Sequence, residues 1–107
     1  MARIRSIKPE FWTSAQVMRC SPLARLLFIG VWNFCDDFGR AAADAMQLGA
    51  QILPRDKIDD AAVRALLEEL AKVELIRFYV VGGREYLEVT GWSKHQKVDR
   101  PQKSRLS

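Results

Sequence analysis

One apolar stretch constrains this chain more than any other. Residues 26–35 read LLFIGVWNFC, in which Asn33 is the only polar side chain. A helix built from this run is apolar on almost every side and has to be buried. Ser21 is a suitable N-cap, Pro22 suits the first helical position, and the turn at residues 36–39 ends the helix. A membrane span needs about 20 residues, so this shorter run predicts a core helix.

A helix that is apolar all round needs cover on two sides. Burial of each large apolar side chain is worth roughly 1.5–3 kcal/mol before entropy is counted, so this helix suffices to anchor a small domain. The chain has 107 residues, which is enough for one core and too few for two. The cover therefore comes either from the rest of this chain or from a second subunit.

Composition and cysteine usage place the chain among ordinary globular proteins. It is 49% apolar and 28% charged. Basic residues near the N-terminus are not followed by an apolar signal core, so we expect a cytoplasmic protein with no membrane association. Cys20 and Cys35 are expected to be free thiols, as in reduced cytosolic proteins. A single histidine and the absence of a Cys-x-x-Cys pair argue against a metal site, and we expect no cofactor.

The positive charge is concentrated at the two ends of the chain. The net charge is +4 at pH 7, made up of +3 in residues 1–8, −3 in residues 9–92 and +4 in residues 93–107. Basic arms on a compact body commonly hold phosphates, and they also occur as solvated tails. Both interpretations remain open from charge alone.

The remaining periodicity predicts three further helices and a hairpin. The helices are expected over residues 9–19, over 45–53 with Asp44 as the cap, and after a cap at Asp59 or Asp60. Strands 75–81 and 84–90, joined by Gly82-Gly83, form the hairpin. Residues 40–43 are expected to be a short extended link. Gly30, inside the central helix, predicts the close approach of another backbone.

This order of elements predicts a winged helix-turn-helix with an extra N-terminal helix. The fold class is mainly α with a small β-hairpin, in which Trp92 closes the core. The domain is expected to span residues 1–92, and residues 93–107 form a basic C-terminal arm that becomes ordered only on binding. Winged helices also serve as dimerisation and protein-interaction modules, so the fold alone does not define the function.

The helix before the hairpin is a poor candidate for reading bases. Its exposed side chains combine Arg64 and Lys72 with carboxylates, and Asp59 and Asp60 lead its N-terminal end, where phosphate would repel them. Backbone contacts from the arms, the turn and the wing fit the charges better. The candidate nucleic-acid-binding residues are Arg3, Arg5, Lys8, Arg55, Lys57, Arg64, Arg77, Arg84, Lys94, His95, Gln96, Lys97, Arg100, Lys103 and Arg105.

Catalysis finds little support in the sequence. Asp36 and Asp37 are adjacent, and their side chains diverge at a helix end, so capping explains them better than acid–base chemistry. His95 lies in a basic run without a nearby nucleophile. Residues 37–39, DFG, lack the glycine-rich and catalytic loops of a kinase. We expect a protein that is not an enzyme.

Several segments together resemble a known family. They are ARIRSIKPEFW (2–12), SPLARLLFIG (21–30), WNF (32–34), DFGR (37–40), LI (75–76) and KHQK (94–97). Their order is similar to the N-terminal winged-helix domain of phage and prophage replication proteins, the DnaD-like replisome-organiser and replication-initiator group. The resemblance implies a bacterial or phage cytosolic protein that binds origin DNA or single strands and helps to recruit helicase machinery. Fuller members carry a C-terminal partner-binding region after this domain, whereas this sequence stops at Ser107.

Two hypotheses of different class follow. The first is a non-enzymatic winged-helix protein that binds duplex or single-stranded DNA, mainly at phosphates, through its arms and wing. The second is a dimerising adaptor, in replication or regulation, that uses leftover apolar surface on Phe11, Trp12 and the central helix. In the second case the partners are another copy of the chain or replication proteins, and the arms are only solvated.

Overall fold

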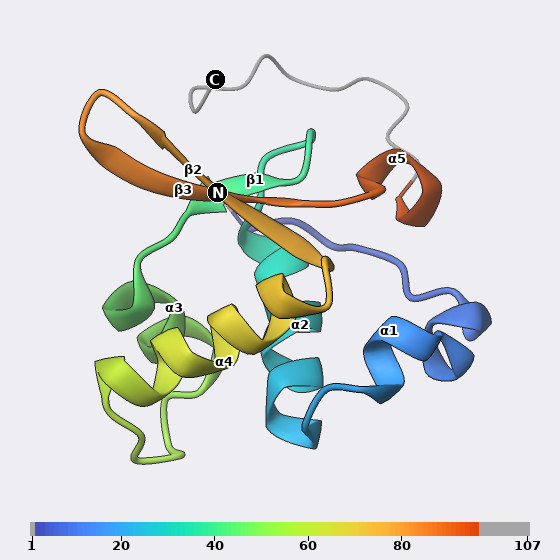
Figure 1. The fold of residues 1–107 in the computed structure, drawn as a ribbon, viewed down its shortest axis with the longest axis horizontal. Helices are drawn as coiled ribbons and strands as arrows, with labels where there is room; N and C mark the ends of the chain where they lie inside the picture. The colour runs from blue at the N-terminus through green and yellow to red at the C-terminus, as the bar shows by residue number, and fades with distance from the viewer. Residues whose placement is uncertain (1, 97–107) are drawn as a thin grey trace.

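The structure, a computed structural model, describes residues 2–96. These residues form a small α/β domain with five α-helices, a short 3-10 helix and one three-stranded antiparallel sheet (Figure 1). Helices α2, α3 and α4 lie on one side of the sheet, and the core fills the space between. The sequence predicted a mainly α fold with a two-stranded hairpin. That prediction is corrected, because a third strand joins the hairpin.

The central helix, α2 (Pro22–Phe34), forms the core as the sequence predicts. The Ser21 hydroxyl accepts a hydrogen bond from the N–H of Ala24 at 3.3 Å and so caps the helix. Leu27, Phe28 and Trp32 on α2 are almost completely buried. Burial is not complete around the helix, since Leu26 remains 52% exposed.

Gly30 of α2 makes room for a neighbouring helix. A Cβ at this position would lie 2.4 Å from Cγ2 of Ile52, at the end of α3 (Ala45–Ile52). The expected close approach is thus real, but the neighbour is a side chain and not a backbone. The absence of a Cβ lets Ile52 pack against the side of α2.

Helices α3 and α4 (Asp60–Lys72) begin where the sequence predicts. Asp44 caps α3 by accepting from the N–H of Gln47 at 3.1 Å, and Asp59 caps α4 by accepting from the N–H of Ala62 at 2.8 Å. The inner face of α4 buries apolar side chains against α2 and α3. These caps and the apolar face are local signals, and they confirm both helices.

The N-terminal helix expected over residues 9–19 is divided in two. A 3-10 helix, η1 (Pro9–Thr13), precedes α1 (Ala15–Met18). Ser14 separates them with an extended backbone, and its hydroxyl accepts from the N–H of Val17 at 3.5 Å. Because Ser14 caps a new helix, one continuous helix is not formed here.

The sheet contains the predicted hairpin and one additional strand. Strands β2 (Ile76–Val81) and β3 (Arg84–Val89) are joined at Gly82-Gly83, as expected. Residues 40–43 were expected to be only a link, but β1 (Arg40–Ala42) pairs antiparallel with β3, so the strand order is β1-β3-β2. Leu87 lies at the centre of the inner face, opposite Ala41 on one side and Phe78 on the other, and is fully buried.

The folded part continues past the expected boundary at residue 92. Trp92 is buried as predicted, and it begins the short helix α5 (Trp92–His95). Its indole N–H donates to the carbonyl oxygen of Asp37 at 2.9 Å. Gly39, at φ +78°, gives room for this ring, because a Cβ there would lie 2.6 Å from it. None of the helices in residues 2–96 has the length and apolar content to cross a membrane.

Candidate nucleic-acid interface

Arg5, a predicted phosphate contact, is buried inside the protein. Its guanidinium donates to the carbonyl oxygens of Trp32 and Cys35, each at 3.0 Å, and of Asp36 at 3.1 Å. It also lies 3.4 Å from a carboxylate oxygen of Asp37 and 4.9 Å from the centroid of the Trp92 ring. The carbonyls at a helix C-terminus lack partners within the helix and favour a nearby cation. Arg5 therefore caps α2, and its guanidinium is occupied within the protein, which disfavours the predicted contact with phosphate.

Arg3 belongs to the same structural cluster. Its Nε lies 3.3 Å from the Asp37 carboxylate, and its backbone N–H and carbonyl pair with the carbonyl and side-chain amide of Asn33, each at 2.8 Å. The Arg3 side chain is 34% exposed, whereas that of Asp37 is only 3% exposed. The N-terminal segment is thus docked on the end of α2, and the expectation of a free basic arm is wrong here.

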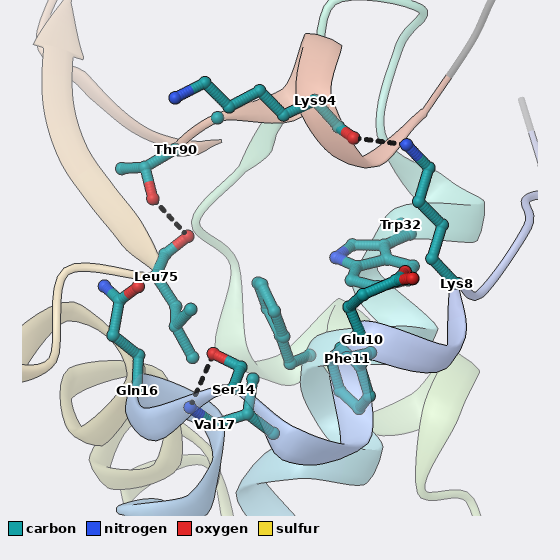
Figure 2. Close-up of a pocket in the computed structure, with 12 residues that line it drawn as sticks. Lys8, Glu10, Phe11, Ser14, Gln16, Val17, Trp32, Leu75, Thr90 and Lys94 are labelled. Atoms are coloured by element: carbon teal, nitrogen blue, oxygen red, sulfur yellow. Dashed lines mark hydrogen bonds between the residues drawn. The ribbon is translucent and has the colours of Figure 1, made fainter.

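The beginning of the predicted C-terminal arm is folded as well. Gln96 is buried, and its side-chain amide bonds both the N–H of Ser6, at 3.1 Å, and the carbonyl of Ser6, at 2.6 Å. Lys8 donates from Nζ to the carbonyl oxygen of Lys94 at 2.6 Å (Figure 2). Gln96 is therefore a structural residue, and the arm does not start at Ser93. Lys97, Arg100, Lys103 and Arg105 lie outside the described residues, and His95 is the last residue of α5.

Arg64 joins α4 to the wing, the hairpin formed by β2 and β3. It lies 3.1 Å from Glu68 on the same helix and 3.2 Å from the second carboxylate oxygen of Glu85 on β3. The guanidinium also lies 4.1 Å from the centroid of the Phe78 ring. Hydrogen bonding to Glu85 raises the pKa of Arg64, and Glu68 acts in the same direction. Two carboxylates of the protein neutralise the charge of Arg64, so this geometry does not support the predicted contact between Arg64 and nucleic acid.

Five of the predicted contact residues are exposed without an ion pair to any residue between 2 and 96. Two of them, Lys8 and Lys94, contact each other beside η1 and α5; the other three lie elsewhere. Arg55 and Lys57 belong to the loop between α3 and α4, and Arg84 begins β3 at the tip of the wing. The loop and the wing tip lie on the same side of the molecule, with the N-terminal end of α4 between them (Figure 1). This side, which we call the wing side, also carries the carboxylates Asp59 and Asp60. These carboxylates would repel a phosphate backbone at the N-terminal end of α4.

The outer face of the sheet contains a group that the sequence prediction missed. Strand register places Tyr79 directly opposite Tyr86, and their rings stack with centroids 5.6 Å apart and planes 29° apart. On the same face, Arg77 pairs with Glu88 and is 71% exposed. Arg40 on β1 pairs with Asp36 at 3.6 Å. The alternation in β3 already indicated a polar face there, but the pairing of β1 was needed to add Arg40.

A cavity of about 530 Å³ opens between η1, α2 and the lower ends of β2 and β3. Phe11, Val17, Trp32 and Leu75 form its apolar floor, while Lys8 and Lys94 lie on its rim (Figure 2). The floor side chains are nearly buried by packing on one another, so little of their surface is available to a ligand. The described lining residues include no histidine or cysteine, and the cavity presents no recognisable nucleophile with its base.

The two cysteines of the described region lie in the interior. Cys20 and Cys35 are buried and unpaired, as expected for free thiols. Burial raises the pKa of Cys35 to about 12, and that of Cys20 is also raised, so neither is a thiolate at neutral pH. Residues 2–96 contain no group of three or more His, Cys, Asp or Glu side chains that could hold a metal ion.

Comparisons with protein-family models, with curated proteins and with solved structures found no match for this chain.

Proposed function

We propose that this protein binds DNA in a winged-helix arrangement, through phosphate contacts from the wing tip and from the loop between α3 and α4. The observation that carries the proposal is the set of uncommitted cations on the wing side: Arg55, Lys57 and Arg84. The loop and the wing tip, which carry these residues, lie toward the same side of the molecule, with α3 and the start of α4 between them (Figure 1). Exposed cations at fixed positions on a folded scaffold suit the phosphate backbone, which positions a protein without specifying sequence.

The proposal differs from one based on charge alone. Arg3, Arg5 and Arg64 are excluded from the interface because carboxylates or helix carbonyls already hold them. The order α3, loop, α4, hairpin is the order of a helix-turn-helix followed by a wing. If the resemblance to phage replication proteins is real, this binding serves DNA replication.

A salt titration with charge-matched variants tests the proposal. Each phosphate contact to duplex DNA contributes a slope of about −0.9 to log K against log salt. Arg55→Gln with Arg84→Gln should therefore make the slope shallower by about 1.8. The control, Arg19→Gln with Lys72→Gln, removes the same charge from exposed positions outside the wing side and should leave the slope near its original value. Absence of binding at 50 mM salt, or equal effects of the two pairs, would refute the proposal.

A second candidate function is self-association, and one observation favours it. Trp12, Met18 and Leu26, on the consecutive elements η1, α1 and α2, are each about half exposed. Large exposed apolar side chains commonly mark protein interfaces when they form one patch. Light scattering would detect a dimer, and Leu26→Lys should dissociate it. A monomer at millimolar concentration would exclude this candidate.

A further inference from the structure

The outer sheet face is defined by the side chains that point away from the helices. The strand register assigns to it Arg77, Tyr79 and Val81 from β2, Arg84, Tyr86 and Glu88 from β3, and Arg40 and Ala42 from β1. The opposite face carries the buried residues Ala41, Ile76, Leu87 and Val89. Helices α2, α3 and α4 all lie on that buried side (Figure 1).

Two aromatic rings form the centre of the outer sheet face. Tyr79 and Tyr86 are half-buried cross-strand partners whose rings already stack on each other. The Tyr79 hydroxyl is buried and has no hydrogen-bond partner among residues 2–96. A buried polar group without a partner is costly in a folded protein, so this hydroxyl adds no stability to the position of the ring.

Cationic side chains surround these rings. Arg84 lies at one end of the face and has no ion pair within residues 2–96, while the Arg77 side chain is 71% exposed despite its pairing with Glu88. Arg40 lies with its guanidinium carbon 5.2 Å from the centroid of the Phe38 ring, which is itself partly exposed. Glu88 and Asp36 offset two of the three charges, so the face is only mildly positive. Stacking surface is therefore its more distinctive property.

We propose that the outer sheet face binds single-stranded nucleic acid, with a base stacked on the Tyr79–Tyr86 pair and phosphates held by Arg84 and Arg77. This inference rests on the proposed nucleic-acid binding and specifies that the bound nucleic acid is single-stranded. Bases in a duplex already stack on each other, so an aromatic platform of this kind favours unpaired strands.

Photo-cross-linking tests the stacking directly. The full chain is irradiated with a single-stranded oligothymidine containing 5-iododeoxyuridine, and the linked peptide is mapped by mass spectrometry. We expect the link at Tyr79 or Tyr86. Links confined to other aromatic residues, such as the exposed Trp12, would overturn the proposal.

Affinity measurements with matched variants provide an independent test. Tyr86→Leu keeps an apolar side chain but removes the ring, and it should weaken single-strand binding about tenfold or more, because stacked bases contribute on that scale. Tyr86→Phe keeps the ring and should bind like the original protein, and Trp12→Leu serves as the control for loss of an exposed aromatic. Thermal unfolding of each variant confirms that it folds. An unchanged affinity in folded Tyr86→Leu would refute stacking.

The two proposals fail in distinguishable ways. Duplex binding that depends on Arg55 and Arg84, without any effect of Tyr86→Leu on single strands, retains the proposed function and rejects the stacking platform. Single-strand binding that depends on Tyr86, with no effect of Arg55→Gln, supports the platform and moves the interface away from the wing side. Absence of binding to both forms at 50 mM salt rejects both.

Discussion

Replacement of Arg5 separates a structural role from a phosphate-binding role. Arg5→Ala removes the donors to three carbonyl oxygens of residues 32–36 and one cation beside Asp37, whose side chain is 3% exposed. Removing one partner of a buried ion pair costs about 3–5 kcal/mol. Arg3 still faces Asp37 after the change, so we expect the lower end, about 3 kcal/mol. For a domain of this size, that corresponds to a fall in the melting temperature of about 12–24 °C.

Arg3→Ala is the matched control, because it removes the same charge from the same segment. The Arg3 side chain is 34% exposed, so solvent screens its pairing with Asp37 and the loss should be below about 1 kcal/mol. Urea unfolding followed by circular dichroism measures the stability of both variants. Arg5→Lys keeps the positive charge but removes the planar guanidinium, so it tests whether charge alone is sufficient to stabilise the end of α2. A difference between Arg5→Ala and Arg3→Ala smaller than about 1 kcal/mol would refute the capping role of Arg5.

Three further predictions concern the core. Gly30→Ala should destabilise the fold by about 1–3 kcal/mol despite the better helix propensity of alanine, because the added methyl group would meet Ile52. Adding Ile52→Ala to the same chain should recover part of that loss, and a double-mutant cycle measures the recovery. The Cys35 pKa is raised from 9.0 to about 12, so between these pH values the folded state keeps a proton that the unfolded chain loses. Stability should therefore fall by about 1.4 kcal/mol per pH unit between pH 9 and pH 12. Alkaline unfolding of Cys35→Ala should lack this contribution. Leu87→Ala should lower the free energy of unfolding by about 2–5 kcal/mol, because Leu87 is fully buried, whereas Leu26→Ala at a half-exposed position should lower it by less than about 1 kcal/mol. Urea unfolding measures both variants, and similar losses would contradict the burial pattern.

The two proposed nucleic-acid surfaces depend on different physical properties. The wing side offers point charges, so its contribution should decline steeply with salt, as expected for counterion release. The outer sheet face offers the Tyr79–Tyr86 rings, whose contribution should persist at salt concentrations that suppress the first. Because Arg77 and Arg84 also hold phosphates on the outer sheet face, the two surfaces are separated by comparing the salt dependence of Arg55→Gln with that of Tyr86→Leu.

Local sequence signals determined the helices α2, α3 and α4 and the hairpin of this protein. Ser21, Asp44 and Asp59 cap the helices that follow them, and Gly82-Gly83 joins two strands. Each signal acts within a few residues, so it can be read without knowledge of the fold. The burial of Leu27 and Trp32 likewise follows from an apolar run too long for the surface and too short for a membrane.

Only the tertiary structure decided which charged and polar residues are free. In the sequence, Arg5, Arg64 and Gln96 look like the other polar residues around them, yet each is held by groups at least four positions away, and Arg5 and Gln96 by groups far along the chain. The strand β1 is three small or charged residues with no periodicity, and it exists because β3 supplies its hydrogen-bond partners. Whether a cation is available to a phosphate depends on the carboxylates and carbonyls that folding brings beside it, and such distant pairings leave no local pattern in the chain.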